Sequence, residues 1–171
     1  MERVNAIRNN EIYQKAMMQN ESYERNRSYC QHGFVHQMDV ARIAYILILE
    51  KGLKVDKEVV YATALLHDIG RYLEYEGKMS HHEASAMIAE EILNLVGYKK
   101  EEIELIVETI LKHRSQSSYN INMDNANTSK RNVEFYDIFY QADKLSRNCF
   151  QCQESASCNW PEDRKNKGII V

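Results

Sequence analysis

Hydrophobic residues recur along most of the chain at the three-to-four-residue spacing of helices that bury one face. The spacing predicts helices over 34–50, from about 56 to the pair at 67–68, and over about 81–96, 101–113 and 132–147. A further helix is expected over 1–18, with Val4, Ile7, Tyr13 and Met17 on a loose apolar face. Only six glycines and one proline interrupt 171 residues. Helix breakers are therefore scarce, and we expect an all-α fold.

Several of the expected helices have ends that can be read from the sequence. Asp56 is a suitable N-cap, and Ser80 with Glu83 three residues later has the pattern of a capping box. Gly97 is expected just after the C-terminus of the helix that follows Ser80. Gly70 is expected to adopt a left-handed conformation and to distort the preceding turn.

The polar residues that interrupt the apolar faces are the chemically informative ones. His36, His113 and Asp143 each continue an inward-facing stripe, and His67-Asp68 ends a strongly apolar helix. Burying a carboxylate costs several kcal/mol unless it is paired or bound to a metal. One core histidine is usually only hydrogen-bonded, but several on separate helices need one another or an ion. Because imidazole and carboxylate are ligands of divalent transition metals, we predict a metal site.

Composition and charge narrow the classes of function. Hydrophobic residues make up 44% and charged residues 27%, and the formal net charge is −3 without a basic stripe. These values favour one domain of ordinary globular composition and argue against a dedicated nucleic-acid binder. The N-terminus lacks an apolar signal core, and the run 43–49 is too short to cross a membrane. We therefore expect a cytoplasmic protein with no membrane association.

The ordered set His36, His67-Asp68 and Asp143 resembles the HD superfamily of metal-dependent phosphohydrolases. The segment 65–71, Leu-Leu-His-Asp-Ile-Gly-Arg, looks like the central motif of that family, and 142–145, Ala-Asp-Lys-Leu, looks like its closing motif. Val40-Ala41 after the first histidine agrees with it as well. The resemblance covers about 30–147. It implies a single-domain helical bundle over 1–171, with the metal site in the core between helices, an N-terminal helix at 1–18 and a cysteine-containing tail at 148–171.

Two further histidines resemble those of family branches with two metals. These branches include the HD-type diadenosine tetraphosphate hydrolases and the HD-GYP phosphodiesterases, although this chain lacks the Gly-Tyr-Pro element of the latter. His82 and His113 fall between the His-Asp pair and Asp143. His81 competes with His82 for this role. We expect His82, because Ala86 follows it by four residues, where the relatives carry a small residue.

The resemblance implies hydrolysis of a phosphate ester or anhydride by metal-activated water, on a small phosphorylated substrate such as a nucleotide or dinucleotide. It implies one or two divalent transition metal ions (Mn, Fe, Co, Ni or Zn), and Asp68 and His67 as catalytic residues, with Asp68 bridging the ions. The implied metal ligands are His36, His67, Asp68, His82, His113 and Asp143. The cations that we expect to contact substrate phosphate are Arg71, Lys78, Arg114 and Lys144.

Two other functions fit the same residues. An HD-fold di-iron oxygenase would use the same ligands, and a catalytically silent nucleotide sensor would bind without turnover. His32, one turn before His36, could support a ligand, face the substrate or lie exposed.

Three segments remain open from the sequence. The polar segment 114–132 could be a lid over the site or could be disordered. Cys149, Cys152 and Cys158 follow the last motif, and with Cys30 they could hold zinc or an iron–sulfur cluster, or could be inert thiols. The tail is expected to fold back on the body, because Trp160 would otherwise be exposed.

Overall fold

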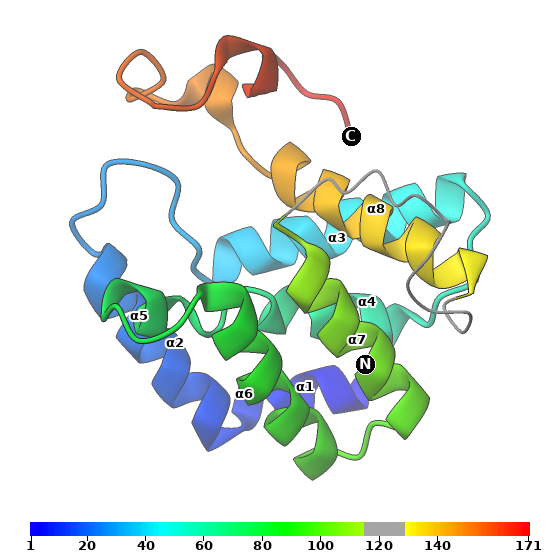
Figure 1. Ribbon diagram of the computed structural model, residues 1–171. Helices are drawn as coiled ribbons and strands as arrows, with labels where there is room; N and C mark the ends of the chain where they lie inside the picture. Colours follow the sequence, from blue (N-terminus) through cyan, green and yellow to red (C-terminus); the bar gives the residue numbers. More distant parts are fainter. Residues whose placement is uncertain (115–128) are drawn as a thin grey trace.

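The computed structural model describes residues 1–114 and 129–171, which form helices joined by short connections (Figure 1). These residues contain no strand, so the predicted all-α class is confirmed. The helices are α1 (Glu2–Asn9), α2 (Glu11–Glu24), α3 (Phe34–Glu50), α4 (Lys57–Leu66), α5 (Arg71–Tyr75), α6 (His81–Leu95), α7 (Lys100–Lys112) and α8 (Lys130–Leu145). Short 3-10 helices follow at Cys149–Gln151 and Glu162–Arg164.

Most of the predicted helix boundaries are confirmed. Helix α3 spans the predicted 34–50, and the Asp56 side chain accepts a hydrogen bond from the Glu58 N–H at 2.7 Å at the start of α4. Helix α6 ends before Gly97, which has a φ of +80° and so takes the left-handed conformation that glycine tolerates.

Two predictions about where helices begin were wrong. The expected helix over 1–18 is divided, because Asn10 is extended and its side chain accepts hydrogen bonds from the N–H groups of Ile12 and Tyr13. Asn10 is therefore the N-cap of a second helix. At α6, the Ser80 hydroxyl donates to the Glu83 carboxylate and does not cap the backbone, so the expected capping box does not form.

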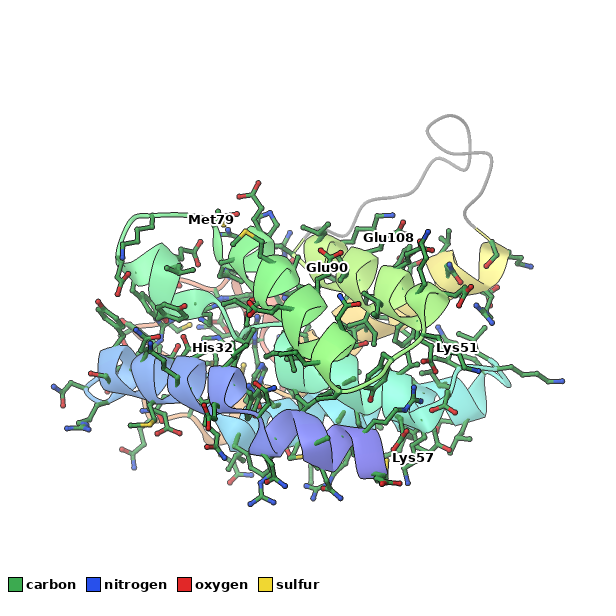
Figure 2. The ribbon with its side chains drawn as sticks, turned by 90° about the horizontal axis from the view of Figure 1, so that it is seen from below. His32, Lys51, Lys57, Met79, Glu90 and Glu108 are labelled. Atoms are coloured by element: carbon green, nitrogen blue, oxygen red, sulfur yellow. The ribbon has the colours of Figure 1, made fainter. Side chains whose placement is uncertain are left out.

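The helices surround one apolar core. Helix α3 packs against α4 and α8, α7 packs against α4, α6 and α8, and α1 and α2 cover the face of α4 and α5 (Figure 1). Phe135 and Phe139 on α8, Ile106 and Ile110 on α7 and Leu66 on α4 are fully buried. Lys51 and Lys57, labelled in Figure 2, lie at the connection between α3 and α4.

Gly70 differs from the prediction in its conformation and in its role. Its φ of −91° is not left-handed. A methyl group in its place would lie 2.5 Å from the Ser85 nitrogen and 2.6 Å from the Ala84 Cβ, because the turn after α4 meets α6 there. Glycine is therefore required by close packing, and the Gly70 N–H donates to Ser85 Oγ at 2.9 Å across that contact.

The last segment, 148–171, extends from α8 and lies near the loop 25–33 that joins α2 to α3 (Figure 1). The tail therefore folds back on the body as expected, and Trp160 contacts Arg147. The proposed lid at 114–132 falls largely on 115–128, outside the described residues. No helix in the described ranges is long and apolar enough to span a membrane.

Candidate metal centre

Five of the six predicted metal ligands come together with His81 in the bundle, in two groups of three. His36, His67 and Asp143 form the first group, and Asp68, His81 and His113 form the second. Within each group the possible ligand atoms all lie within 4.8 Å of one another. The first group joins α3, the end of α4 and α8, and the second joins the turn after α4 to α6 and the end of α7.

Hydrogen bonds on the far side of each imidazole orient the first group. His67 Nδ1 lies 2.8 Å from the Ala64 carbonyl oxygen, which can only accept, so Nδ1 carries a proton. The Ser146 hydroxyl donates to the Asp143 carbonyl oxygen and so accepts from His36 Nδ1, at 3.2 Å. The Nε2 atoms of His36 and His67 then face each other at 3.3 Å. Their lone pairs repel unless a positive charge lies between them.

The second group repeats this arrangement. His113 Nδ1 donates to the Ile110 carbonyl oxygen at 2.5 Å, and His81 Nδ1 donates to the Glu74 carboxylate at 2.5 Å. The Nε2 atoms of His81 and His113 are 3.3 Å apart. Histidines that bind metals commonly donate the other ring N–H to a carbonyl or carboxylate in this way. The donor sets of both groups therefore fit divalent transition metal ions.

One carboxylate joins the two groups. Asp68 Oδ2 lies 3.4 Å from His67 Nε2 and 3.8 Å from His36 Nε2, whereas Oδ1 lies 3.5 Å from His81 Nε2 and 3.7 Å from His113 Nε2. Each oxygen of Asp68 thus faces a different group. This is the arrangement that a bridging carboxylate requires.

Burial and neighbouring charges have opposite effects on the pKa values of His67 and Asp68 in this cluster. Burial by itself would lower the pKa of His67, but the carboxylates of Asp68 and Asp143 raise it to about 10. Burial would raise the pKa of Asp68, yet the neighbouring imidazoles, His67 foremost, hold it well below its usual range. Burial lowers the pKa of His36, and it lowers that of His81 to about 4. The two carboxylates therefore attract a cation, whereas His36 and His81 favour the neutral form that binds metal.

The turn that carries the His-Asp pair is held by a buried side chain of α2. The Asn20 amide donates to the carbonyl oxygens of Asp68 and Ile69 at 3.1 and 3.2 Å, and its oxygen accepts from the Tyr72 N–H at 2.7 Å. Asn20 therefore satisfies backbone groups that the end of α4 leaves unpaired. It positions Asp68 through the backbone, because these hydrogen bonds go to backbone groups and not to the side chains of either group.

The structure brings His81, and not the expected His82, to the cluster. His81 is buried and faces Asp68 and His113, whereas His82 belongs to neither group and its Nδ1 has no hydrogen-bond partner among the described residues. Adjacent residues on a helix point about 100° apart, so only one of the two can face the cluster. Ser85, four residues after His81, contacts Gly70 and is the small residue that marks this face of α6.

A cavity of about 530 Å³ opens beside both groups. Three of the four predicted phosphate-binding cations line it: Arg71, Arg114 and Lys144. Lys78 does not, because it lies on the surface and pairs with Glu76 at 2.7 Å. His32 lines the cavity and is paired with Glu24 at 2.6 Å, beside α2, where Figure 2 labels it.

Several residues of this cavity were missed from the sequence. Arg27, Arg147 and Arg164 add positive charge, and Glu74 supports both His81 and Arg114. Arg147 could have been found, because it follows Asp143 by four residues on one helical face. The other three come from loops or short elements, where periodicity gives no signal.

The HD domain family model matches residues 33–148, which include both groups. The chain belongs to the HD domain family. This confirms the resemblance seen in the sequence and places the protein in a superfamily of metal-dependent phosphohydrolases.

Individual proteins are also similar to this chain. An uncharacterized protein of Clostridium beijerinckii is 40% identical over 166 residues, which cover 97% of each chain. Ribonuclease Y of Fervidobacterium nodosum is 39% identical over 75 residues, and ribonuclease Y of Pseudothermotoga lettingae is 42% identical over 62 residues. These two matches cover 40% and 36% of this HD protein but only 14% and 12% of the ribonucleases. No solved structure matches.

Proposed function

We propose that this HD protein is a binuclear metal-dependent phosphohydrolase. The observation that carries the proposal is the position of Asp68, with one oxygen toward each group of ligands. His36, His67 and Asp143 would hold one divalent ion, and His81 and His113 the other, with Asp68 between them. Two such ions supply a water of lowered pKa and neutralise charge on phosphoryl oxygens. Asp68 would orient that water from its position between the two groups.

The charge of the cavity supports a phosphorylated substrate. Among the described residues, six basic side chains line it: Arg27, Arg71, Arg114, Lys144, Arg147 and Arg164. Two of its three acidic residues, Asp68 and Asp143, would be neutralised by bound cations. Arg147 Nη1 is buried and has no hydrogen-bond partner within the described residues. An unpaired guanidinium nitrogen at a cavity wall suits a phosphate oxygen.

Aromatic residues in the same wall support a nucleotide as the substrate class. Trp160 and Tyr140 line the cavity, and the Arg147 guanidinium lies 3.6 Å from the centre of the Trp160 ring. Rings of this kind stack on nucleobases, and such stacking contributes about 1–3 kcal/mol per base. Trp160→Ala should therefore raise KM for a nucleotide about tenfold or more and leave KM for p-nitrophenyl phosphate nearly unchanged.

The first test counts metal ions in three chains. Wild-type protein loaded with Mn²⁺ should bind two ions, His81→Ala should bind one tightly, and His82→Ala should still bind two. His82 is the matched control, because it is the same residue type one position along α6. Equal stoichiometry in wild type and His81→Ala would contradict the binuclear site.

The second test is turnover. Wild-type protein with Mn²⁺ and without oxygen is assayed on mononucleotides, dinucleoside polyphosphates and a short oligoribonucleotide, the last because of the partial similarity to ribonuclease Y. Asp68→Asn should lower kcat at least a thousandfold with its helical content preserved. Two bound ions without hydrolysis would instead favour the sensor, and oxygen consumption by the iron-loaded protein would favour the oxygenase.

A further inference from the structure

The four cysteines of the chain lie far apart in sequence and meet at one place in the fold. Cys30, Cys149, Cys152 and Cys158 all line a cavity of about 630 Å³ between the loop 25–33 and the tail 148–171. They are the only cysteines present, and none forms a disulfide. The cavity lies next to the active site, because Cys30 and Cys158 also line the cavity there.

Local structure presents the thiols to this cavity. Cys149 begins a 3-10 helix, and the Cys152 N–H donates to the Cys149 carbonyl oxygen at 3.2 Å, which brings the first two thiols of the tail onto one tight turn. The Tyr29 hydroxyl donates to the Ser157 carbonyl oxygen at 3.3 Å. That bond joins the residue before Cys30 to the residue before Cys158. The loop 25–33 and the tail are thus joined by residues next to their cysteines.

Polar contacts hold the tail: the Asn166 amide donates to the carbonyl oxygens of Lys144 and Arg147 at 2.9 and 2.6 Å, at the end of α8. No side chain from 147 to 171 is fully buried, although the segment follows a defined path over α8 and the loop 25–33. A bound metal would add a constraint to a segment with so little apolar burial, as it commonly does in small protein units. Positive charge faces the thiols as well. Arg147 and Lys165 line the same cavity as the four thiols.

In the part of the chain that the structure describes, the thiols do not form the close group that a tetrahedral zinc site requires. Among the described residues, no three cysteine Sγ atoms lie within 4.8 Å of one another. A tetrahedral zinc site with Zn–S bonds of about 2.3 Å would bring its sulfurs to about 3.8 Å from one another. An iron–sulfur cluster places several irons between its four thiolates and so suits a wider spacing.

We propose that Cys30, Cys149, Cys152 and Cys158 bind a four-iron, four-sulfide cluster that fastens the tail to the loop 25–33. The cluster would hold Trp160 and Arg164 in the wall of the active-site cavity. It is separate from the histidine–carboxylate centre and does not depend on the phosphohydrolase proposal.

The test measures acid-labile sulfide, which the histidine–carboxylate centre does not contain. Wild-type full-length protein is purified without oxygen and then reconstituted with equal amounts of ferrous and ferric iron and with sulfide. We expect about four sulfides per chain, with an equal number of irons beyond those of the HD site. Cys152→Ala should lower the sulfide content at least tenfold, whereas Gln153→Ala, the exposed neighbouring position, should leave it unchanged.

Folding of the variant is checked by its helical content and by its Mn²⁺ stoichiometry at the HD site, both of which should match wild type. Wild-type protein that takes up no sulfide after reconstitution overturns the proposal, whatever the variants do. So does a zinc ion bound by the thiols in place of iron and sulfide. A chain that binds the cluster but hydrolyses no phosphate supports this proposal and contradicts only the proposed function.

Discussion

The contact between Gly70 and α6 can be tested by a single methyl group. In Gly70→Ala the new Cβ would lie 2.5 Å from the Ser85 nitrogen and 2.7 Å from the Ala84 carbonyl carbon, both backbone atoms of a helix. Overpacking of this kind costs about 1–3 kcal/mol. Displacing α6 also disturbs the buried bond from the Gly70 N–H to Ser85 Oγ, and an unpaired buried group costs about 1–3 kcal/mol.

Alanine restricts the unfolded chain more than glycine does, which offsets about 0.4–1 kcal/mol of that loss. We therefore expect Gly70→Ala to lower the free energy of unfolding by about 3 kcal/mol. With an m-value of about 2 kcal/mol/M, the urea midpoint of the metal-free protein should fall by about 1.5 M at unchanged m. Far-ultraviolet circular dichroism measures the transition.

The matched control is Gly33→Ala. No atom lies within 4 Å of the position that its Cβ would take, and its φ of −73° suits any residue. Its free energy of unfolding should change by no more than about 0.5 kcal/mol. Equal midpoints for the two variants would refute the packing argument. Because α6 carries His81 and the preceding turn carries Asp68, Gly70→Ala should also weaken Mn²⁺ binding.

Two further predictions concern the turn after α4 and the charge of His67. Asn20→Ala removes three hydrogen bonds to the turn at 68–72 and should lower the free energy of unfolding by about 2–4 kcal/mol, measured by urea unfolding against the exposed control Lys15→Ala. In metal-free protein the pKa of His67 is raised from 6.5 to about 10, so its stabilisation is complete below pH 6.5 and is lost as the pH rises toward 10. Between pH 7 and 8.5 we expect the free energy of unfolding of metal-free wild-type protein to fall by about 2 kcal/mol. His67→Gln and Mn²⁺-saturated protein should not show this fall. Equal dependence of the free energy of unfolding on pH in all three samples would contradict the prediction.

Most of the helices and the first group of ligands could be predicted from the sequence because both depend on local spacing. The period of apolar residues placed α3 to within a residue, and Asp56 and Gly97 marked helix ends through interactions with their own neighbours. His36, His67 and Asp143 stood out as polar members of inward stripes, and their order along the chain resembled the HD family. The same reasoning missed the division at Asn10, where one side chain competes with the helix for backbone N–H groups.

Only the tertiary structure decided between His81 and His82, because the choice depends on how α6 is rotated about its axis. The close contact of Gly70 with Ser85 sets that rotation, and the two residues are fifteen positions apart. Lys78 was expected at the cavity and does not line it, whereas Arg147 was not expected there and does. The reason is similar: whether a cation faces the cavity depends on where its loop or helix packs. The amino-acid sequence by itself determined the helices and the chemistry available, since these follow from local periodicity and residue type. Which side chains share a site was decided by packing between distant segments, as the meeting of Cys30 with the three cysteines of the tail illustrates.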